Sequence, residues 1–324
     1  MIDAAAVGRR SRRIETKGVG LHVVVEGEGP LLILLHGFPQ SWYLWRNQID
    51  PLIAAGFQVA IPDQRGYGAS DQPADISDYN ILRLIDDVVG IADALGQESF
   101  TLIQHDMGAY VGWHTALLRP DRVRAIASLS VPYKRSAPGR TTRQDPADTA
   151  FRYIPYFQEP GVAERELDRD VRAALRLLFV GLSGDAPKNN PMFATRPRSA
   201  GLLGGLVYDE GPLPWLSDAD LDYYAKQYAG GFRGPINWYR NIDRNLELTP
   251  QLAGAQVAQP AIYIGGERDP TARQHRIGIE ELEVNVPGLR AKHFIPGAGH
   301  WLQMERPAEV NAILVDFANA CARP

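Results

Sequence analysis

Short, continuously apolar segments alternate with segments of helical periodicity over the first 130 residues, and this alternation constrains the fold more than any other feature. Strands that are apolar throughout, and not only at every second position, are typical of a parallel sheet covered on both faces. Strands separated by helices predict right-handed crossovers and an α/β fold. We interpret 21–25, 31–35, 57–61, 100–103 and 124–129 as strands, and 82–95 and 110–118 as helices.

The pattern changes after Ser130 and later returns. Residues 133–150 hold few apolar side chains and predict a long surface connection, whereas 151–231 favour helices around a Gly-, Pro- and Asn-rich loop at 181–214. The strand–helix rhythm resumes at 261–264 and 291–295 and ends in an amphipathic C-terminal helix. An all-helical insert within an α/β domain is the simplest explanation, and such an insert would form a lid. We therefore expect a first part of the core at 1–132, a helical cap (lid) domain at 133–235 and a second part of the core at 236–324.

The composition excludes several classes of function. The chain has 324 residues, of which 45% are hydrophobic and 22% charged, as in an ordinary globular protein. A net charge of −4 provides no basic field for nucleic acid, and no apolar run approaches the ~20 residues of a membrane span. The single cysteine, Cys321, excludes an internal disulfide and a thiolate metal cage, and it fits a reducing compartment. We expect a cytoplasmic protein with no nucleic-acid partner and no membrane span.

Four arginines, at positions 9, 10, 12 and 13, resemble a twin-arginine export signal. Such a signal requires an apolar run after the arginines, but residues 14–17 are of mixed polarity and 21–25 is too short. The pattern therefore predicts a solvated basic tail that leads into the first strand.

The segment 100–110, Phe-Thr-Leu-Ile-Gln-His-Asp-Met-Gly-Ala-Tyr, is the most informative of the chain. A predicted strand runs into Asp106, and a predicted helix follows at once with Gly108 and Gly112 on its first turns. A strand-to-helix elbow holds its apex residue in an exposed, strained position, and small neighbours let the strand and the helix approach closely. Two interpretations of Asp106 stay open from this segment alone: a nucleophile at the apex, or the N-cap of the helix.

Residues with matching chemistry follow three other predicted strands. His36-Gly37-Phe38-Pro39 stands where α/β hydrolases keep an oxyanion loop, so the backbone N–H groups of Phe38 and Met107 would converge on one oxygen. Asp269 and His300 each follow a strand in a Gly-rich segment, and the order nucleophile, acid, histidine is that of an α/β-hydrolase triad. Glu267 is an alternative acid two residues before Asp269.

With these residues the chain resembles the epoxide hydrolase branch of the α/β-hydrolase superfamily over nearly its whole length. The core stretches 36–45, 63–70 and 105–106 are shared with esterases and dehalogenases, whereas the lid stretches 153–161 and 231–240 are specific to epoxide hydrolases. The resemblance implies an α/β-hydrolase fold, a mostly parallel sheet of roughly eight strands flanked by helices, with an inserted helical cap domain. The sequence departs from the family at Gln104, where relatives often have Gly, and at Met107, where many have Trp.

The resemblance also implies a reaction. Asp106 would open an epoxide to form a covalent alkyl ester, with Tyr153 and Tyr239 of the lid donating protons to the leaving oxygen. His300, oriented by Asp269, would then activate a water that hydrolyses the ester, and the product would be a vicinal diol. Tyr156, which lies close to Tyr153 in the sequence, is the alternative for one of these two proton donors. The N–H groups of Phe38 and Met107 would stabilise the oxyanion of the second step. Trp42, His105 and Trp301 are expected to contact the substrate.

The implied partner is a small, apolar epoxide, and neither a metal nor an organic cofactor is expected. A homodimer is expected from base rates alone. Two alternatives use the same fold: a haloalkane dehalogenase with the same aspartate, and an inactive member that binds a small ligand. Met107 disfavours the first alternative, because a methionine offers no indole N–H to a halide.

Overall fold

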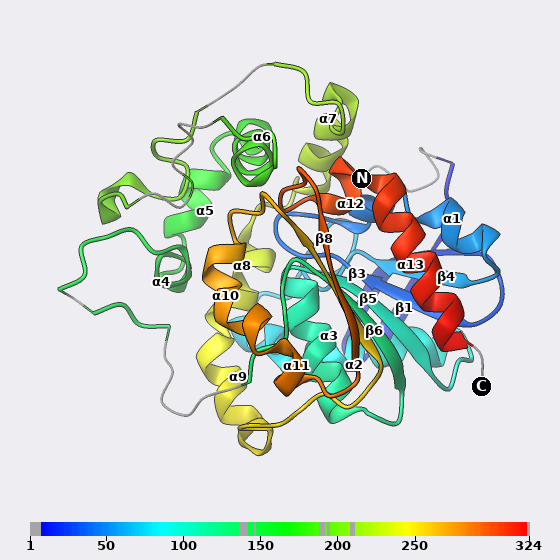
Figure 1. Ribbon diagram of the computed structural model, residues 1–324. Coiled ribbons are helices and arrows are strands. Elements are labelled where there is room, and N and C mark those ends of the chain that lie inside the picture. The colour runs from blue at the N-terminus through cyan, green and yellow to red at the C-terminus, as the bar shows by residue number, and fades with distance from the viewer. Residues whose placement is uncertain are drawn as a thin grey trace.

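Eight strands form one sheet at the centre of the molecule (Figure 1). The computed structural model describes residues 8–135, 142–145, 147–187, 192, 195–207 and 211–322. The strands are β1 (Ser11–Thr16), β2 (Val19–Glu26), β3 (Leu31–Leu35), β4 (Gln58–Pro62), β5 (Phe100–His105), β6 (Val123–Leu129), β7 (Ala261–Gly266) and β8 (Leu289–Ile295). Their order across the sheet is β1-β2-β4-β3-β5-β6-β7-β8. β2 pairs antiparallel with β1 and β4, and the other pairs are parallel, so the predicted mostly parallel sheet is confirmed.

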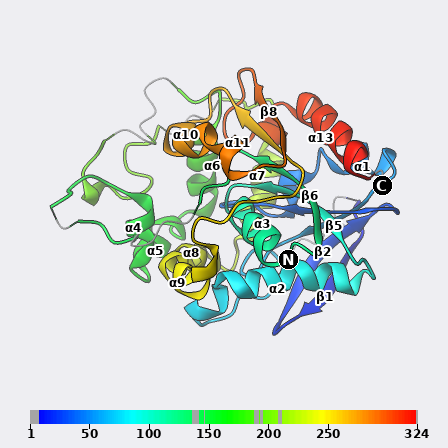
Figure 2. The ribbon, with the colours of Figure 1, turned by 60° about the horizontal axis from the view of Figure 1, so that its bottom comes forward.

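Helices cover both faces of this sheet. In Figure 2, α2 and α3 pack together on one face, and α13 lies with α1 on the other. The helices are α1 (Ile49–Ala54), α2 (Ile81–Ala94), α3 (Met107–Leu118), α4 (Tyr153–Gln158), α5 (Val162–Leu167), α6 (Val171–Leu182), α7 (Asp218–Gln227), α8 (Arg233–Arg240), α9 (Ile242–Leu248), α10 (Ala272–Glu280), α11 (Leu282–Asn285), α12 (Leu302–Glu305) and α13 (Pro307–Ala322). The short 3₁₀ helices include η2 (Trp42–Trp45) and η3 (Ile76–Tyr79).

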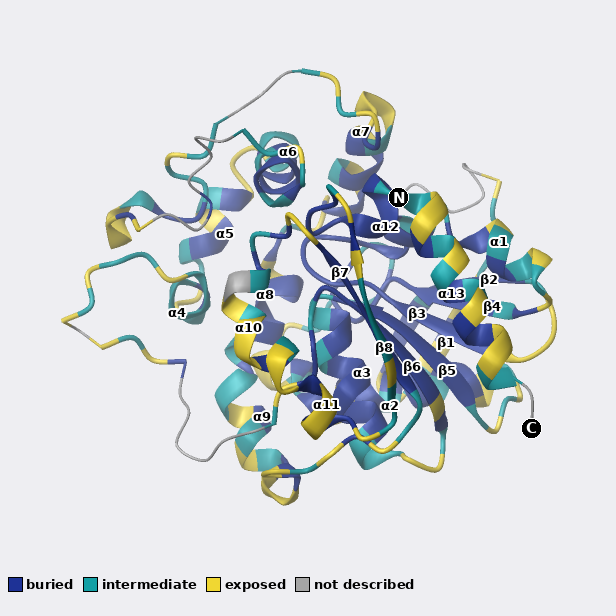
Figure 3. Cartoon of the chain, viewed as in Figure 1, coloured by how far each residue is buried: buried dark blue, intermediate teal, exposed yellow. Residues whose placement is uncertain are grey.

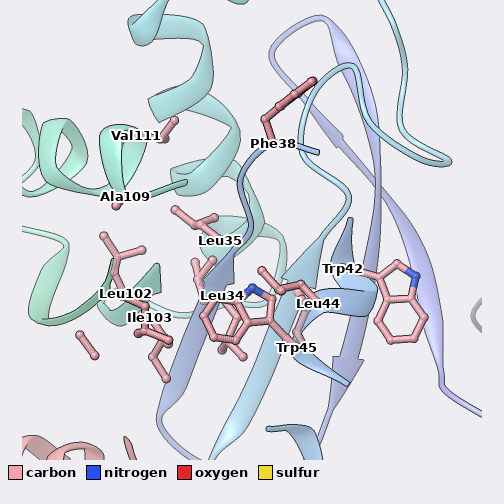
Figure 4. Packing of buried hydrophobic residues seen from close by; sticks show 14 of the residues in the cluster. Leu34, Leu35, Phe38, Trp42, Leu44, Trp45, Leu102, Ile103, Ala109 and Val111 are labelled. Carbon is pink, nitrogen blue, oxygen red and sulfur yellow. The ribbon is translucent and has the colours of Figure 1, made fainter. Parts of the chain in front are cut away.

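The central strands are buried along their whole length, which explains why their sequences are apolar at consecutive positions. Every residue of β3 and β5 is buried, and the sheet is dark throughout its centre in Figure 3. Figure 4 shows Leu34 of β3 and Leu102 of β5 in the same packed cluster as Ala109 of α3. Because side chains point alternately to the two faces of a strand, burial of both faces favours apolar residues at consecutive positions, as throughout β3, while β5 also buries Thr101, Gln104 and His105.

The described residues between β6 and β7 form helices and add no strand to the sheet. α4, α5 and α6 lie together beside the sheet, on the left in Figure 1. The expected boundary between residues 235 and 236 falls within α8, which packs against α4 and also against η3. Parts of the expected connection at 133–150 and of the expected loop at 181–214 lie outside the described residues. The division into 1–132, 133–235 and 236–324 stays a prediction.

The predicted solvated tail at the N-terminus is wrong from residue 11 on, while the described residues 8–10 precede the first strand. Residues 11–16 form β1, the edge strand beside β2, and only Ile14 of this strand is buried. The neighbouring arginines are paired with carboxylates: Arg9 with Asp50 at 2.6 Å and Arg13 with Asp71 at 2.8 Å. Since an edge strand exposes most of its side chains, its sequence is polar enough to resemble a tail. Residues 1–7 lie outside the described part of the chain.

Helix lengths bear on the membrane prediction. In the part of the chain that the structure describes, no helix combines the length and the apolar character needed to cross a membrane.

Candidate active site

Asp106 stands at the turn between β5 and α3, in a backbone conformation that non-glycine residues rarely adopt. Its φ is 50° and its ψ −122°, and its side chain makes no capping hydrogen bond to α3. The turn is so tight that position 108 requires a glycine. A Cβ there would lie only 2.5 Å from the carbonyl oxygens of both Leu35 and His36. The structure therefore has Asp106 at the apex of an elbow and not as a side-chain cap, with 20% of the side chain accessible.

The loop after β3 meets the Asp106 carboxylate. The backbone N–H of Phe38 donates to Oδ1 of Asp106 at 2.8 Å. A Cβ at Gly37 would lie 2.4 Å from the same Oδ1 and 2.7 Å from the amide nitrogen of Met107. The absence of a side chain at Gly37 thus leaves room for the Asp106 carboxylate and the Met107 amide. Of the two predicted oxyanion donors, the Phe38 amide contacts Asp106, and the role of the Met107 amide stays a prediction.

His300 lies between two carboxylates. Its Nε2 is 3.6 Å from Oδ2 of Asp106, and its Nδ1 is 3.2 Å from Oδ2 of Asp269. The other oxygen of Asp269 accepts hydrogen bonds from the backbone N–H and the hydroxyl of Thr271, at 2.8 and 2.7 Å. Asp269 is 5% exposed, whereas Glu267, the alternative acid, is exposed to solvent. The structure therefore pairs the histidine with Asp269.

This arrangement shifts the pKa values of all three groups. Burial alone would lower the pKa of His300, but the charges of Asp269 and Asp106 and the hydrogen bonds to them raise it to about 10. Burial would raise the pKa of Asp269, but the same histidine lowers it to about 2. The pKa of Asp106 is also lowered, because His300 and the Phe38 amide outweigh burial. At neutral pH the resting site holds an imidazolium between two carboxylates.

Tyr153 and Tyr239 come together from different helices. Tyr153 begins α4 and Tyr239 lies in α8, and their ring centroids are 6.0 Å apart. The ring of Tyr239 is 5.8 Å from that of Phe38, whose amide binds Asp106. Burial, followed by the negative charge of Asp106, raises the pKa of Tyr239 well above its usual value, so the phenol keeps its proton. The alternative, Tyr156, donates its hydroxyl to Glu166 at 2.7 Å within the helical segment.

The three expected substrate contacts lie in the interior, each with no measurable exposure. The indole N–H of Trp42 donates to the hydroxyl of Tyr223 at 2.9 Å. His105 and Trp301 both pack on the ring of His300, with centroids 4.6 Å away in each case. Nε2 of His105 lies 2.8 Å from the carbonyl oxygen of His300. This contact holds the loop that carries His300, the histidine loop. The structure thus makes these residues neighbours of His300 or of the core, and their contact with substrate stays a prediction.

Glu305 is a buried carboxylate that the sequence analysis does not single out. One of its oxygens accepts the N–H groups of Gly299 and Gly184, both at 2.9 Å, and the other accepts that of Trp301 at 3.0 Å. Glu305 therefore ties the residues on either side of His300 to the segment that follows α6. An acid among apolar residues of a short helix, Leu302-Gln-Met-Glu305, is the signal that could have revealed it.

Ser130, directly after β6, is a second residue of the site that the sequence analysis does not propose for a role. Its hydroxyl donates to Oδ2 of Asp269 and lies 2.8 Å from Nδ1 of His300. Ser130 is fully buried and has a φ of 65°. Only its place at the carboxyl end of a parallel strand could have pointed to it, since ligand and catalytic residues gather at that edge.

Gln104, the departure from the family pattern, is accommodated by a glycine of α3. A Cβ at Gly112 would lie 1.6 Å from Oε1 of Gln104, so the carboxamide occupies the space that a side chain at Gly112 would need. The amide nitrogen of Gln104 donates to the hydroxyl of Ser128 at 3.3 Å. The longer residue is therefore housed between α3 and β6.

Among the residues that the structure describes, no three or more His, Cys, Asp or Glu side chains gather so that they could hold a metal ion.

Comparisons with known proteins agree with this geometry. The profile of the α/β hydrolase fold family matches residues 30–307. Epoxide hydrolase A of Mycobacterium tuberculosis is 42% identical over 94% of this chain and 96% of its own length. The solved structure of an epoxide hydrolase from an endophytic Streptomyces has a TM-score of 0.91 and 39% identity, covering 97% of this chain and 96% of that one. The crystal structure of epoxide hydrolase A from Mycobacterium thermoresistibile has a TM-score of 0.89 and 43% identity, covering 96% and 98%.

Proposed function

We propose a reaction mechanism for this chain from the premise that it belongs to the epoxide hydrolases of the α/β-hydrolase fold family. As an epoxide hydrolase it converts an organic epoxide and water to a vicinal diol. The proposal covers the residues that perform this conversion. The observation that carries it is the Asp106 carboxylate, which is partly accessible and has an amide N–H on one oxygen and His300 beside the other.

Asp106 is the nucleophile in this proposal. Its Oδ1 accepts the N–H of Phe38, which leaves Oδ2 to attack an epoxide carbon from the rear. A bond forms between Oδ2 and that carbon while the carbon–oxygen bond of the ring breaks. The ring oxygen takes a proton from Tyr153 or Tyr239, because an alkoxide is far more basic than a phenolate. The product of this step is an alkyl ester of Asp106.

The ester changes the state of His300. Esterification removes the negative charge of Asp106, one of the two charges that raise the pKa of the histidine. The imidazolium then gives up its proton more easily, and that proton restores the phenol. Neutral His300 can now accept a proton from a water molecule, and the resulting hydroxide adds to Cγ of the ester.

The second step regenerates the carboxylate. The added hydroxide turns the ester carbonyl into an oxyanion, which the N–H groups of Phe38 and Met107 would stabilise. When this intermediate collapses, the bond between Cγ and the ester oxygen breaks and that oxygen takes the proton of the added hydroxyl group. The diol leaves, and the carboxylate of Asp106 and the imidazolium of His300 are restored. Asp106 keeps the oxygen of the water. Asp269 stabilises the imidazolium that forms on His300 in this step.

The alternatives receive less support from the surroundings of Asp106. A haloalkane dehalogenase needs N–H donors for its halide, and Met107 supplies no side-chain donor. The indole N–H groups of Trp42 and Trp301 already donate within the protein, to Tyr223 and to the carbonyl oxygen of Phe179. An inactive ligand-binding protein would have no need for phenols opposite an anionic carboxylate.

The other expectations stay part of the proposal. The substrate is a small, apolar epoxide, and the helical segment at 133–235 is a cap domain that carries Tyr153 above the sheet. α8 adds Tyr239 just beyond the expected boundary. A homodimer and a cytoplasmic location remain predictions.

A two-substrate assay tests the proposed function. The purified protein is incubated with styrene oxide and, separately, with a bromoalkane. Formation of phenylethanediol without release of bromide supports the proposal. Release of bromide without formation of diol would replace it with dehalogenation, and the absence of both products would favour the inactive protein. Asp106→Ala serves as the control for uncatalysed hydrolysis.

A further inference from the structure

The hydroxyl of Ser130 lies between the acid and the base of the triad. Its oxygen is 2.8 Å from Nδ1 of His300, whereas the nearer oxygen of Asp269 is 3.2 Å from the same nitrogen. The hydroxyl also donates to that oxygen, Oδ2 of Asp269. The shorter contact of Nδ1 is therefore made with the serine and not with the aspartate.

The available protons permit one hydrogen-bond pattern. Asp269 carries no proton, because His300 holds its pKa far below neutrality. The hydroxyl of Thr271, 3.3 Å from that of Ser130, already donates to Oδ1 of Asp269. The Ser130 proton thus goes to Oδ2 of Asp269, and a lone pair of its oxygen accepts the Nδ1–H of His300. The N–H of the histidine is shared between the serine oxygen and the carboxylate.

The backbone at Ser130 is held in an unusual conformation by the strand that leads to Asp269. Among the described non-glycine residues, only Asp106 and Ser130 have a positive φ. The N–H of Ser130 donates to the carbonyl oxygen of Ile264 at 2.9 Å, and its carbonyl oxygen accepts the hydroxyl of Tyr263 at 3.0 Å. Such a conformation costs free energy and persists where the surrounding contacts determine it. Both contacts come from β7.

A second set of contacts fixes the turn from the side of the nucleophile. The side-chain nitrogen Nε2 of Gln104, two residues before Asp106, donates to the hydroxyl of Ser128. That hydroxyl in turn donates to the carbonyl oxygen of Val131 at 2.7 Å. The strands that carry Asp106 and Asp269 thus both fix the turn that presents Ser130.

We propose that Ser130 is a positioning residue of this site: its hydroxyl shares with Asp269 the binding of the His300 Nδ1–H, so that Nε2 stays directed at Asp106. The inference rests on the proposed function. The contact matters most in ester hydrolysis, where Nε2 takes the proton of water and the imidazolium must be stabilised through Nδ1. Alkylation by Asp106 needs no base and depends on it less.

Two variants and one matched control test the role. Ser130→Ala removes the hydroxyl and keeps a Cβ at the same φ, whereas Ser130→Gly removes it and relieves the backbone. Thr115→Val removes a hydroxyl that is equally buried but donates to the carbonyl oxygen of Val111 within α3, away from the triad and from the turn at Ser130. Single-turnover experiments with styrene oxide measure formation and decay of the alkyl-enzyme separately. The proton resonance of His300 Nδ1–H, identified by its loss in His300→Gln, reports the hydrogen bond itself.

We expect both Ser130 variants to slow ester decay by about tenfold or more, because each loses a hydrogen bond to a charged group. The rate of alkylation should change less than about threefold. The Nδ1–H resonance should move in both variants and stay in place in Thr115→Val. Wild-type decay in Ser130→Gly, or slow decay with an unmoved resonance, would overturn the inference. If the wild type itself forms no diol, the proposed function fails, and the resonance still decides whether Ser130 binds His300.

Discussion

Nε2 of His300 lies 3.6 Å from Oδ2 of Asp106, while the opposite nitrogen of the ring lies 3.2 Å from Asp269. The histidine therefore faces the nucleophile with the nitrogen that the acid does not hold. Since Asp106 loses its charge on alkylation, one chemical event both forms the ester and removes a group that keeps His300 protonated.

The path of the water oxygen distinguishes attack by Asp106 from direct attack of water on the epoxide. In one turnover in ¹⁸O-water with enzyme in excess, we expect the label in the Asp106 carboxylate and none in the first diol. Mass spectrometry of the peptide that contains Asp106 measures the incorporation. Labelled diol from the first turnover would show that the water attacks the epoxide directly and that no ester forms.

Ester hydrolysis should require a deprotonated His300. With Asp106 charged, the pKa of His300 is raised to about 10; with Asp106 esterified, we expect a lower value, because one carboxylate charge is gone. The rate constant of ester decay should therefore rise with pH and level off below pH 10, and the ester should accumulate in acid. Rapid-quench measurements from about pH 5 to pH 9 follow this change. A decay rate that falls as the pH rises would contradict the role of His300 as base.

Loss of the Tyr239 hydroxyl should slow formation of the ester. We expect Tyr239→Phe to reduce the alkylation rate by about 10- to 100-fold, since Tyr153 remains as a donor, and to leave ester decay less affected. Stopped-flow measurement of alkylation tests this. Tyr156→Phe is the matched control: it removes a phenol of α4 that donates to Glu166. It should cost about 1 kcal/mol of stability and leave the alkylation rate unchanged.

Gly112 should be required because Gln104 fills the space beside it. Alanine is the better helix former by about 1 kcal/mol, so helix propensity alone predicts that Gly112→Ala stabilises α3. The buried carboxamide of Gln104 stands where the new methyl group would lie, and we expect a loss of about 1–3 kcal/mol in the free energy of unfolding. Gln104→Ala in the same chain should recover most of the loss. Urea unfolding of the four proteins of this cycle measures the coupling.

The parallel part of the sheet could be predicted because burial on both faces imposes apolar residues at consecutive positions, as in β3 and β5. The edge strand β1 could not. Only one of its residues is buried, and its charged side chains pair with carboxylates from distant segments. The sequence marks Ser130 only by its place after a parallel strand, and Glu305 only as an acid beside apolar residues. Their importance comes from bonds to His300, Asp269 and the histidine loop, and a single serine or glutamate carries no such information.

The amino-acid sequence by itself determined the α/β architecture and placed Asp106, Asp269 and His300 after three separate strands of one sheet. Only the tertiary structure decided that Asp106 does not cap its helix, that the histidine pairs with Asp269 and not with Glu267, and that Ser130 joins them. The physical reason is how far apart in the chain the interacting residues lie. Periodicity records what covers a segment, whereas the bond from Ser130 to His300 joins residues 170 positions apart and exists only once the sheet brings its strand ends together.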